Sequence, residues 1–204
     1  LVQGLVRKAS ESPDGPPVWT LQGVETGTMI GYHSIVVIAE AQAKGFKGID
    51  YKAAWEPFRK RAMVDDYRGL SWYRKLGYIP SDKEGEAVSK TLEYAYDDWA
   101  MAHLAKGVGA GTDAKKLKQR SQNYRHVFDR KLEFMRPRGS DGKWLEPFDP
   151  IATGHSVRLA SSSSRSSDRR GWPVLDTRAI SSRIFRRRSA GSASTRTTRN
   201  ASSQ

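Results

Sequence analysis

The sequence predicts a mainly helical fold that ends in a disordered tail rich in arginine and serine. Three observations support this expectation: apolar residues recur at helical spacing in several segments, Gly and Pro separate those segments, and alternating strand patterns are scarce. Helix pairs joined by long loops are typical of a helical array or of an (α/α) barrel, and the residues alone do not decide between the two.

The positive charge of the chain is concentrated at its C-terminal end. The 204 residues carry a formal net charge of +13 and have a pI near 10.1. Residues 157–204 contain 11 Arg, no Lys, 2 Asp and 13 Ser, whereas residues 1–156 hold 24 basic and 20 acidic groups. A nucleic-acid interface needs basic charge clustered on the folded part or on a dedicated arm, and only an arm is compatible with this distribution.

The first expected helix follows a surface loop at residues 9–17 that is rich in Pro and Gly. Thr26 or Thr28 can cap its first turn, and Gly45 is expected to end it. Its apolar face is so broad that we expect this helix to be buried on more than one side. The residues of that face are Met29, Ile30, Ile35, Val36, Ile38 and Ala39.

Two shorter helices and one long helix are expected next. Residues 52–63 have helical spacing, with Pro57 either in the first turn or at a kink, and residues 69–77 form a short helical turn. Residues 87–106 show the strongest helical pattern of the chain, with one apolar stripe that we expect to be buried. That stripe consists of Val88, Leu92, Ala95, Trp99 and Ala102.

A further helix is expected over residues 112–128, with Thr112 or Asp113 as its cap. A short extended stretch at residues 134–138 and a turn at residues 140–142 should follow it. The candidate inner face of the helix consists of Leu117, Tyr124, Val127 and Phe128.

Three carboxylates in the middle of the long helix are candidates for a binding site. Glu93 and Asp97 are four residues apart, so they share a helix face and repel by roughly 0.2–0.5 kcal/mol when exposed. Together with Asp98, and beside aromatic walls, they could accept hydrogen bonds from sugar hydroxyls or steer a cation. The alternative is a solvated helix face with Lys90 as a neighbour, and the residue pattern alone favours that alternative.

A second candidate wall lies in a Pro-containing segment near residue 140. Arg136 and Arg138 are followed by Trp144, Glu146 and Asp149. Carbohydrate sites combine an aromatic plate for the apolar face of the sugar with planar charged groups for its hydroxyls, and Trp144 with Glu146 fits that combination. A structural loop held by an Arg–Glu pair explains the segment equally well.

Glu25 and His33 flank the start of the first expected helix. A lone His on a largely apolar helix is more often a satisfied core group than a ligand. A Glu near a helix N-terminus is favoured by the helix dipole whether or not it has a function. Spacing alone therefore assigns neither residue a catalytic role.

Several function classes have no support in the sequence. It contains no P-loop, dinucleotide-binding, HExxH or GxSxG motif, and its 4 His residues are scattered. Without cysteine there is neither a disulfide framework nor a Cys-ligated zinc site. No apolar run is long enough to span a membrane, so we expect no membrane partner, and the first residues lack the pattern of a signal peptide.

Several strings occur together in the chain, in a characteristic order and spacing. They are ETGTMIGYHS at residues 25–34, YRKLGY at 73–78, SKTLEYAYDDW at 89–99, RSQNYRHVF at 120–128, FMRPR at 134–138 and DGKWLEPFDP at 141–150. Over residues 17–156, these strings resemble glycoside hydrolase family 92. SKTLEYAYDDW and WLEPFDP are the most specific of them.

The resemblance implies a calcium-dependent exo-α-mannosidase that inverts the anomeric configuration and has an (α/α)6-barrel catalytic domain behind a β-sandwich. It implies hydrolysis of terminal α-linked mannose from mannan or N-glycans, with α-1,2 as the expected linkage. It also implies a secreted or periplasmic location. Residues that match family positions are expected to line or brace the mannose pocket. They are Glu25, His33, Glu93, Asp97, Asp98, Arg136, Glu146 and Asp149.

The family's acid motif, of the Thr-Glu-Gly-Asn type, should follow the FDP string that ends at Pro150, and it does not occur in the sequence. The later segments that bring the base and the calcium ligands do not occur either. Inverting glycosidases need both carboxyl groups, roughly 6.5–9.5 Å apart. We therefore expect no catalytic residue and no bound calcium in this chain, and an inactive fragment.

The resemblance divides the chain into three parts. Residues 1–16 are expected to be a loop or a truncated N-terminal segment, residues 17–156 a partial catalytic domain of an (α/α)6 barrel, and residues 157–204 a basic low-complexity tail, frameshifted or disordered. Two alternatives remain: a carbohydrate-binding remnant without turnover, and a protein whose basic arm docks on nucleic acid. We do not expect nucleic acid as a partner.

Overall fold

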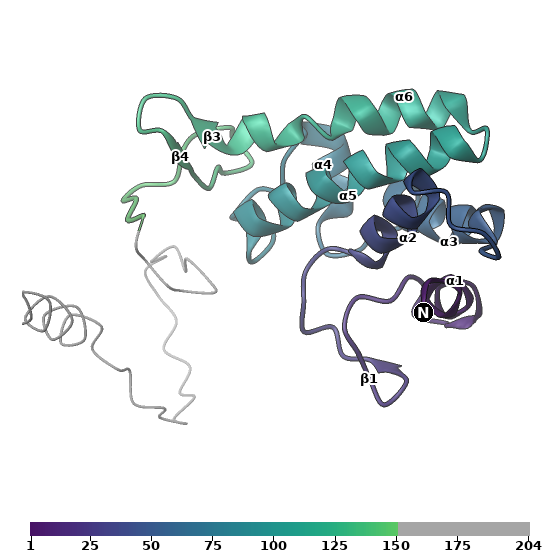
Figure 1. Cartoon of the computed structure of the whole chain (residues 1–204). Coiled ribbons are helices and arrows are strands. Elements are labelled where there is room, and N and C mark those ends of the chain that lie inside the picture. The colour runs from purple at the N-terminus through teal and green to yellow at the C-terminus, as the bar shows by residue number, and fades with distance from the viewer. Residues whose placement is uncertain (151–204) are drawn as a thin grey trace, which may run out of the picture. The chain divides into compact units, whose positions relative to one another are not determined.

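The computed structural model describes residues 1–150, and these residues are mainly helical, which confirms the predicted fold class (Figure 1). Predictions that concern residues 151–204, including the basic tail, lie outside the described residues. The elements are α1 (Val2–Glu11), β1 (Thr20–Leu21), β2 (Val24–Glu25), α2 (Ser34–Ala43), α3 (Tyr51–Met63), α4 (Leu70–Leu76), α5 (Ala87–Gly107), α6 (Gly111–Arg120), the 3₁₀ helix η1 (Asn123–Val127), β3 (Phe128–Asp129) and β4 (Phe134–Met135).

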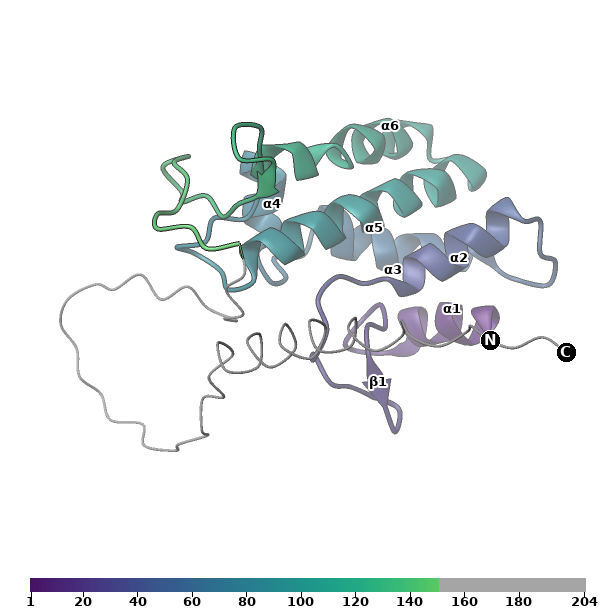
Figure 2. The same cartoon turned by 60° about the vertical axis from the view of Figure 1, so that its left-hand side comes forward.

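The helices pack as neighbouring pairs around the long helix α5. Helix α5 contacts α6 on one side and α2 on the other, and α3 lies against α1, α2 and α5 (Figures 1 and 2). The strands form two short antiparallel hairpins, β1 with β2 and β3 with β4. No helix within residues 1–150 has the length and apolar content needed to cross a membrane.

Helix α1 occupies a segment that was expected to be a loop. Val2, Leu5, Val6 and Ala9 recur at helical spacing, and Val6 and Ala9 are buried against the neighbouring helices. Burial of that apolar stripe stabilises a helix that is short by itself. The surface loop expected at residues 9–17 therefore begins later than predicted, because α1 continues to Glu11.

The loop before α2 replaces the first turns that were expected to be helical. Gly27 and Gly31 adopt φ of +64° and +76°, a left-handed backbone that a right-handed helix cannot contain. Thr26 does not cap a helix, because its hydroxyl donates to the carbonyl of Trp19 at 2.7 Å across the β1–β2 hairpin. Thr28 likewise lies in the loop, so the predicted cap is wrong.

Helices α2 and α3 otherwise follow the prediction. Gly45, with φ of +72°, follows the end of α2, and Asp50 caps α3 by accepting from the amide of Ala53 at 2.9 Å. Pro57 lies in the interior of α3 rather than in its first turn. Because proline lacks an N–H, it cannot donate to the carbonyl of Ala53, and the hydroxyl of Ser10 in α1 donates to that carbonyl at 3.4 Å instead.

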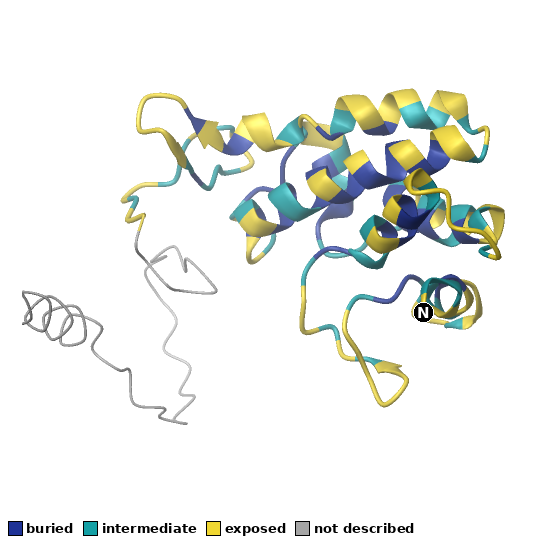
Figure 3. Cartoon of the chain, in the orientation of Figure 1, coloured by how far each residue is buried: buried dark blue, intermediate teal, exposed yellow. Residues whose placement is uncertain are grey.

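Helix α5 buries part of the predicted stripe, since Ala95 and Ala102 are buried and Val88 and Leu92 half-buried, but it also buries charged residues that were not predicted. Trp99, a member of the expected stripe, is 50% exposed, whereas Asp97 and Asp98 are fully buried. Figure 3 shows that this helix has buried and exposed faces along its length. The apolar pattern did not predict burial of Asp97 and Asp98, because they are charged. Each is paired with a residue from another part of the chain.

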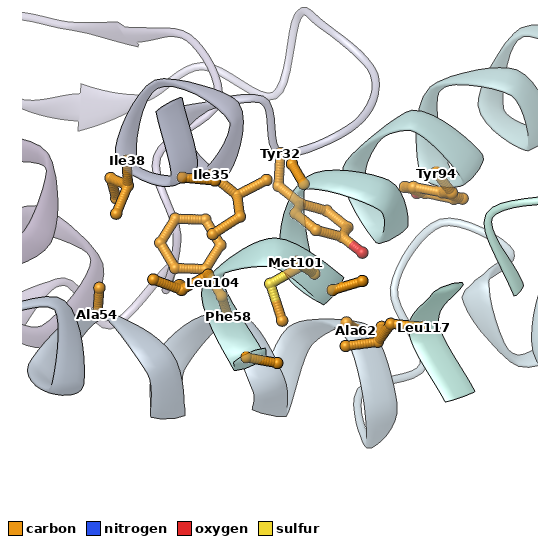
Figure 4. Packing of buried hydrophobic residues seen from close by; sticks show 14 of the residues in the cluster. Tyr32, Ile35, Ile38, Ala54, Phe58, Ala62, Tyr94, Met101, Leu104 and Leu117 are labelled. Carbon is orange, nitrogen blue, oxygen red and sulfur yellow. The ribbon is translucent and has the colours of Figure 1, made fainter. Parts of the chain in front are cut away.

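The core is built from aromatic and aliphatic side chains of α2, α3, α5 and α6 (Figure 4). Tyr32 lies between Phe58 and Tyr94, with ring centroids 6.4 and 5.8 Å away. Met101, Leu104 and Leu117 complete this layer and are fully buried. Full burial of such a side chain contributes about 1.5–3 kcal/mol.

The segment after α5 is more broken than predicted. Helix α6 ends at Arg120 and continues as η1, so the expected helix to residue 128 is wrong. Asp113 does not cap α6, because its carboxylate accepts from Nε of Arg59 at 2.9 Å. The hairpin β3–β4 and a turn at Gly142, with φ of +79°, confirm the extended stretch and turn that were expected.

Candidate functional site

The first candidate cluster lies where the loop before α2 meets α5. The imidazole of His33 lies between two carboxylates of α5: its Nδ1 is 2.7 Å from Oδ1 of Asp97, and its Nε2 is 2.7 Å from Oε2 of Glu93. The backbone amide of Tyr32 donates to Oδ2 of Asp97 at 2.8 Å. The loop is therefore fastened to α5 through Asp97, and His33 relieves the repulsion expected between Glu93 and Asp97.

Burial and hydrogen bonding shift the titration of this cluster. Burial raises the pKa of Asp97 to about 6, although the hydrogen bond from His33 opposes the increase. The hydrogen bond to Asp97 raises the pKa of His33, while partial burial works in the opposite direction. The side chains of His33 and Glu93 keep 38% and 39% of their surface exposed, so both can meet a ligand.

Asp98 belongs to a separate, buried network. Nε of Arg120 donates to Oδ2 of Asp98 at 2.6 Å, Nη2 of Arg120 donates to Oδ1, and the hydroxyl of Tyr73 lies 2.9 Å from Oδ2. Burial raises the pKa of Asp98, and the guanidinium of Arg120 opposes that increase. Asp98 thus joins α4, α5 and α6 and is not available to a ligand.

A row of aromatic rings runs along the exposed surface of α5 away from His33. Tyr96 and Trp99 are about half exposed, and their rings are nearly parallel, 10° apart with centroids separated by 6.2 Å. His33 lies 6.1 Å from the ring of Tyr96, and His103 lies 4.5 Å from Trp99. Flat exposed rings beside hydrogen-bonding groups suit the apolar face and the hydroxyls of a sugar.

Glu25 braces the β1–β2 hairpin. Its carboxylate accepts from the backbone amides of Val18 at 2.8 Å, Trp19 at 3.1 Å and Gly27 at 3.0 Å. Burial raises the pKa of Glu25, but the backbone N–H donors outweigh it and leave the pKa lowered. Glu25 also lines a pocket of about 440 Å³ together with Arg61 and Arg68.

In the segment near residue 140, two arginine side chains lie against aromatic rings. Arg136 donates to Oδ2 of Asp129 at 2.7 Å and to Oε1 of Glu146 at 2.5 Å, and its guanidinium lies 4.8 Å from the ring centroid of Phe148. Arg138 lies against Trp144, 4.7 Å from its ring centroid. The Arg–Glu pair considered for this loop is therefore present.

The predicted site residues fall into several groups rather than one. His33, Glu93 and Asp97 are brought together, and Asp98 lies in the buried network beside them. Glu25 lies in the β1–β2 hairpin, and the remaining predicted residues lie in the segment that follows β4. Glu146 and Asp149 are exposed near the end of the described residues. Sequence reasoning missed Tyr73 and Arg120 as partners of Asp98, although both occur in the strings YRKLGY and RSQNYRHVF.

The described residues do not fit a calcium ion. Within residues 1–150, no group of three or more His, Cys, Asp or Glu side chains could hold a metal. The carboxylate oxygens of Asp97 are engaged by His33 and a backbone amide, and those of Asp98 by Arg120 and Tyr73. Calcium prefers six to eight oxygen ligands that converge on one point, and these carboxylates do not converge.

Comparison with known proteins identifies glycoside hydrolases as relatives of this chain. A model of the glycosyl hydrolase family 92 catalytic domain matches residues 1–172, a range wider on both sides than the 17–156 expected. An uncharacterized secreted glycosidase of Arthroderma benhamiae is 31% identical over 169 residues, which cover 69% of this chain and 22% of that protein.

Solved structures extend the likeness to the fold. A family GH92 α-mannosidase of Bacteroides thetaiotaomicron, BT3965, solved in complex with mannoimidazole, is 41% identical with a TM-score of 0.70, over 74% of this chain and 20% of that one. The inverting family GH92 mannosidase BT2199 of the same organism is 31% identical with a TM-score of 0.68, over 76% of this chain and 23% of that one. The chain spans about a fifth of the length of these relatives, and it belongs to glycoside hydrolase family 92.

Proposed function

We propose that residues 1–150 form part of the glycan-binding side of an α-mannosidase that hydrolyses terminal α-linked mannose. The observation that carries this proposal is the half-exposed pair His33–Glu93 beside the parallel rings of Tyr96 and Trp99. The names of the mannosidase relatives support mannose as the sugar.

Each member of the cluster has a part in the proposed binding. Glu93 can accept hydrogen bonds from sugar hydroxyls, and the rings of Tyr96 and Trp99 offer a surface for the apolar face of the ring. Asp97 is a positioning residue, because it is buried beneath His33 and fixes the orientation of the imidazole. Such fixed donors and acceptors reduce the entropy lost when a ligand binds.

Catalysis by inversion requires an acid and a base on opposite sides of the scissile bond. Both oxygens of Asp97 and both of Asp98 are engaged inside the protein, so neither carboxylate can reach a substrate. The family resemblance puts the acid motif after Pro150 and the base in a later segment, and we therefore place both groups on residues other than 1–150. The 204 residues alone are expected to bind sugar without turnover.

The finer features of the reaction rest on the family resemblance. They are inversion at the anomeric carbon, a preference for α-1,2-linked mannose of mannan or N-glycans, and dependence on calcium. Because the described residues do not fit calcium, the ion would be held by other parts of the parent enzyme, where it would stabilise developing negative charge on oxygen. The secreted glycosidase among the relatives supports a location outside the cytoplasm.

Binding by the full 204-residue chain tests this proposal. In isothermal titration calorimetry we expect methyl α-D-mannopyranoside to bind and methyl α-D-galactopyranoside to bind at least fivefold more weakly. Trp99→Ala should abolish measurable binding, whereas Tyr124→Ala, which removes a ring 37% exposed in η1, should not. Equal affinity for the two sugars, or unchanged binding by Trp99→Ala, would contradict the proposed function.

Turnover is tested separately with α-1,2-mannobiose and calcium. We expect no mannose release from the 204-residue chain, because the acid and base lie elsewhere in our assignment. Release of mannose that is abolished by a substitution within residues 1–150 would overturn that assignment and leave the binding proposal standing.

A further inference from the structure

A hollow whose lining includes Glu25 of β2 lies outside the His33–Glu93 cluster. It has a volume of about 440 Å³ and is lined by the loop at residues 13–18, by residues 25–27, and by Arg61, Tyr67 and Arg68. Small-molecule sites commonly have volumes of about 300–1,000 Å³. The hollow therefore has room for a sugar ring.

The positively charged wall of this hollow is held rigidly. The guanidinium of Arg61 lies 3.9 Å from the ring centroid of Tyr67, its Nη2 donates to the carbonyl of Asp14 at 2.7 Å, and its Nε donates to Asp65 at 3.3 Å. Those bonds use two of the five N–H donors of the guanidinium. Arg61 is only 7% exposed, so the remaining donors are presented by a buried, oriented group.

Arg68, which also lines the hollow, fastens the loop that follows β2. Its Nη1 donates to the carbonyl of Met29 at 2.6 Å, and its Nη2 donates to the carbonyl of Gly27. The same loop is fixed to α5 at its other end by Asp97, which binds the amide of Tyr32 and the ring of His33. The loop between the two sites is thus held at both ends.

The charges around the hollow balance. Arg61 and Arg68 are opposed by Glu25 and Asp14, and Glu25 remains ionised because backbone amides lower its pKa. A phosphate would meet two carboxylates and an amine would meet two guanidinium groups, so neither charge is favoured. Planar charged groups placed beside apolar surfaces, here Pro16, Val18 and Tyr67, suit a neutral polyhydroxylated ring instead.

We propose that this pocket is a second sugar subsite, which holds one neutral pyranose unit of a glycan whose other unit lies against His33 and Glu93. The assignment of the ligand as a mannose-containing glycan rests on the proposed function. His33 follows Gly27 by six positions, and a segment of that length spans at most about 20 Å. An oligosaccharide of a few units can bridge such a distance.

Amide chemical shifts of the full 15N-labelled chain test the subsite, with methyl α-D-mannopyranoside as the probe. We expect the amides of Val18 and Gly27 to shift at the pocket and the amide of Tyr32 to shift at the other site. His33→Ala should abolish the Tyr32 response and preserve the Gly27 response. Loss of both responses in that variant would overturn the second subsite.

Substitutions of residues that line the pocket provide a second test of the subsite. Asp14→Asn changes an exposed carboxylate that lines the pocket, and it should weaken the Gly27 response at least threefold while the Tyr32 response is unchanged. Tyr67→Phe keeps the apolar ring and removes only a hydroxyl, so it should leave both responses unchanged. Tyr124→Ala is the matched control. A response at Tyr32 without one at Gly27 refutes the subsite alone, whereas a response at neither site refutes the proposed function as well.

Inorganic phosphate as a probe distinguishes an anion site from a neutral-sugar site. If phosphate shifts the amide of Gly27 and the mannoside does not, the pocket is an anion site and the proposal is wrong. If the mannoside shifts Gly27 and phosphate at the same concentration does not, the neutral-sugar assignment holds.

Discussion

Two adjacent aspartates of α5 have opposite environments. Asp97 lies beneath a half-exposed histidine that connects it to the surface, whereas Asp98 is enclosed by Arg120 and Tyr73 in the interior. Consecutive residues of a helix point about 100° apart, so a pair of like charges is divided between two faces. Two adjacent residues of one short acidic string therefore have different roles. Asp97 positions a ligand-facing histidine, and Asp98 joins neighbouring helices.

The largest expected loss of stability follows from substitution of the enclosed aspartate, Asp98. Asp98→Ala leaves the guanidinium of Arg120 buried without its partner, and we expect the free energy of unfolding to fall by about 3–5 kcal/mol. Urea unfolding followed by circular dichroism measures it. The double variant Asp98→Ala with Arg120→Met should recover part of the loss, and a loss below about 1 kcal/mol in the single variant would show that Asp98 does not join the helices.

The next effect concerns the loop that carries His33. In Gly31→Ala, the added Cβ would lie 2.8 Å from the ring of His33 and 3.1 Å from Oδ2 of Asp97, at φ of +76°. We expect a loss of about 3 kcal/mol in the free energy of unfolding, from backbone strain and displacement of the histidine. Gly23→Ala is the matched control, since Gly23 has φ of +82° but nothing within 4 Å of its Cβ position, and it should cost only about 1 kcal/mol.

Equal losses for the two glycine variants would mean that the space beside His33 is not tightly filled. The same variants distinguish the two aspartates, because Gly31→Ala should disturb the titration of His33 and leave the Asp98–Arg120 pair intact.

The smallest effect is the pH dependence of stability that the Asp97–His33 pair contributes. The pKa values of Asp97 and His33 are both raised in the folded state, so the native pair binds more protons than the unfolded pair. Its contribution to stability is therefore present at low pH and is lost as pH rises from about 4, through about 6 for Asp97, and then through the raised pKa of His33. The coupled groups share this titration.

Comparison with the variant His33→Gln and Asp97→Asn isolates that contribution. The difference in the free energy of unfolding between wild type and variant should shrink between pH 5 and pH 8. A difference that grows over this range would have the wrong sign for the environment described. In Asp97→Asn alone, NMR titration of the ring of His33 should show a lowered pKa.

Much of the helical framework was predictable from the sequence because it depends on local signals. Glycines such as Gly45 end helices wherever a left-handed residue is needed, and the long pattern before Gly107 predicted α5 well. The start of α2 was predicted wrongly because apolar residues in the preceding loop resemble a helix. Its actual conformation depends on Gly27, Gly31 and the hairpin contact of Thr26.

The candidate site was predicted only in part, for a different reason. His33, Glu93 and Asp97 were all named from the family resemblance, but their mutual contact depends on packing of α2 against α5, which no local pattern encodes. The apolar stripe of α5 wrongly included Trp99 and omitted Asp97 and Asp98, because a charge is costly to bury unless a partner from elsewhere neutralises it. Arg120 supplies that partner for Asp98 from 22 positions along the chain.

The most direct measurement compares two glutamates on neighbouring helices. Glu93→Gln removes the charge beside His33, and Glu40→Gln removes a charge paired with Lys44 on the surface of α2. With methyl α-D-mannopyranoside and calorimetric detection, Glu93→Gln should weaken binding by at least tenfold and Glu40→Gln by less than twofold. Equal affinities for both variants and the wild type would contradict the assignment of the His33–Glu93 cluster as the glycan-binding site.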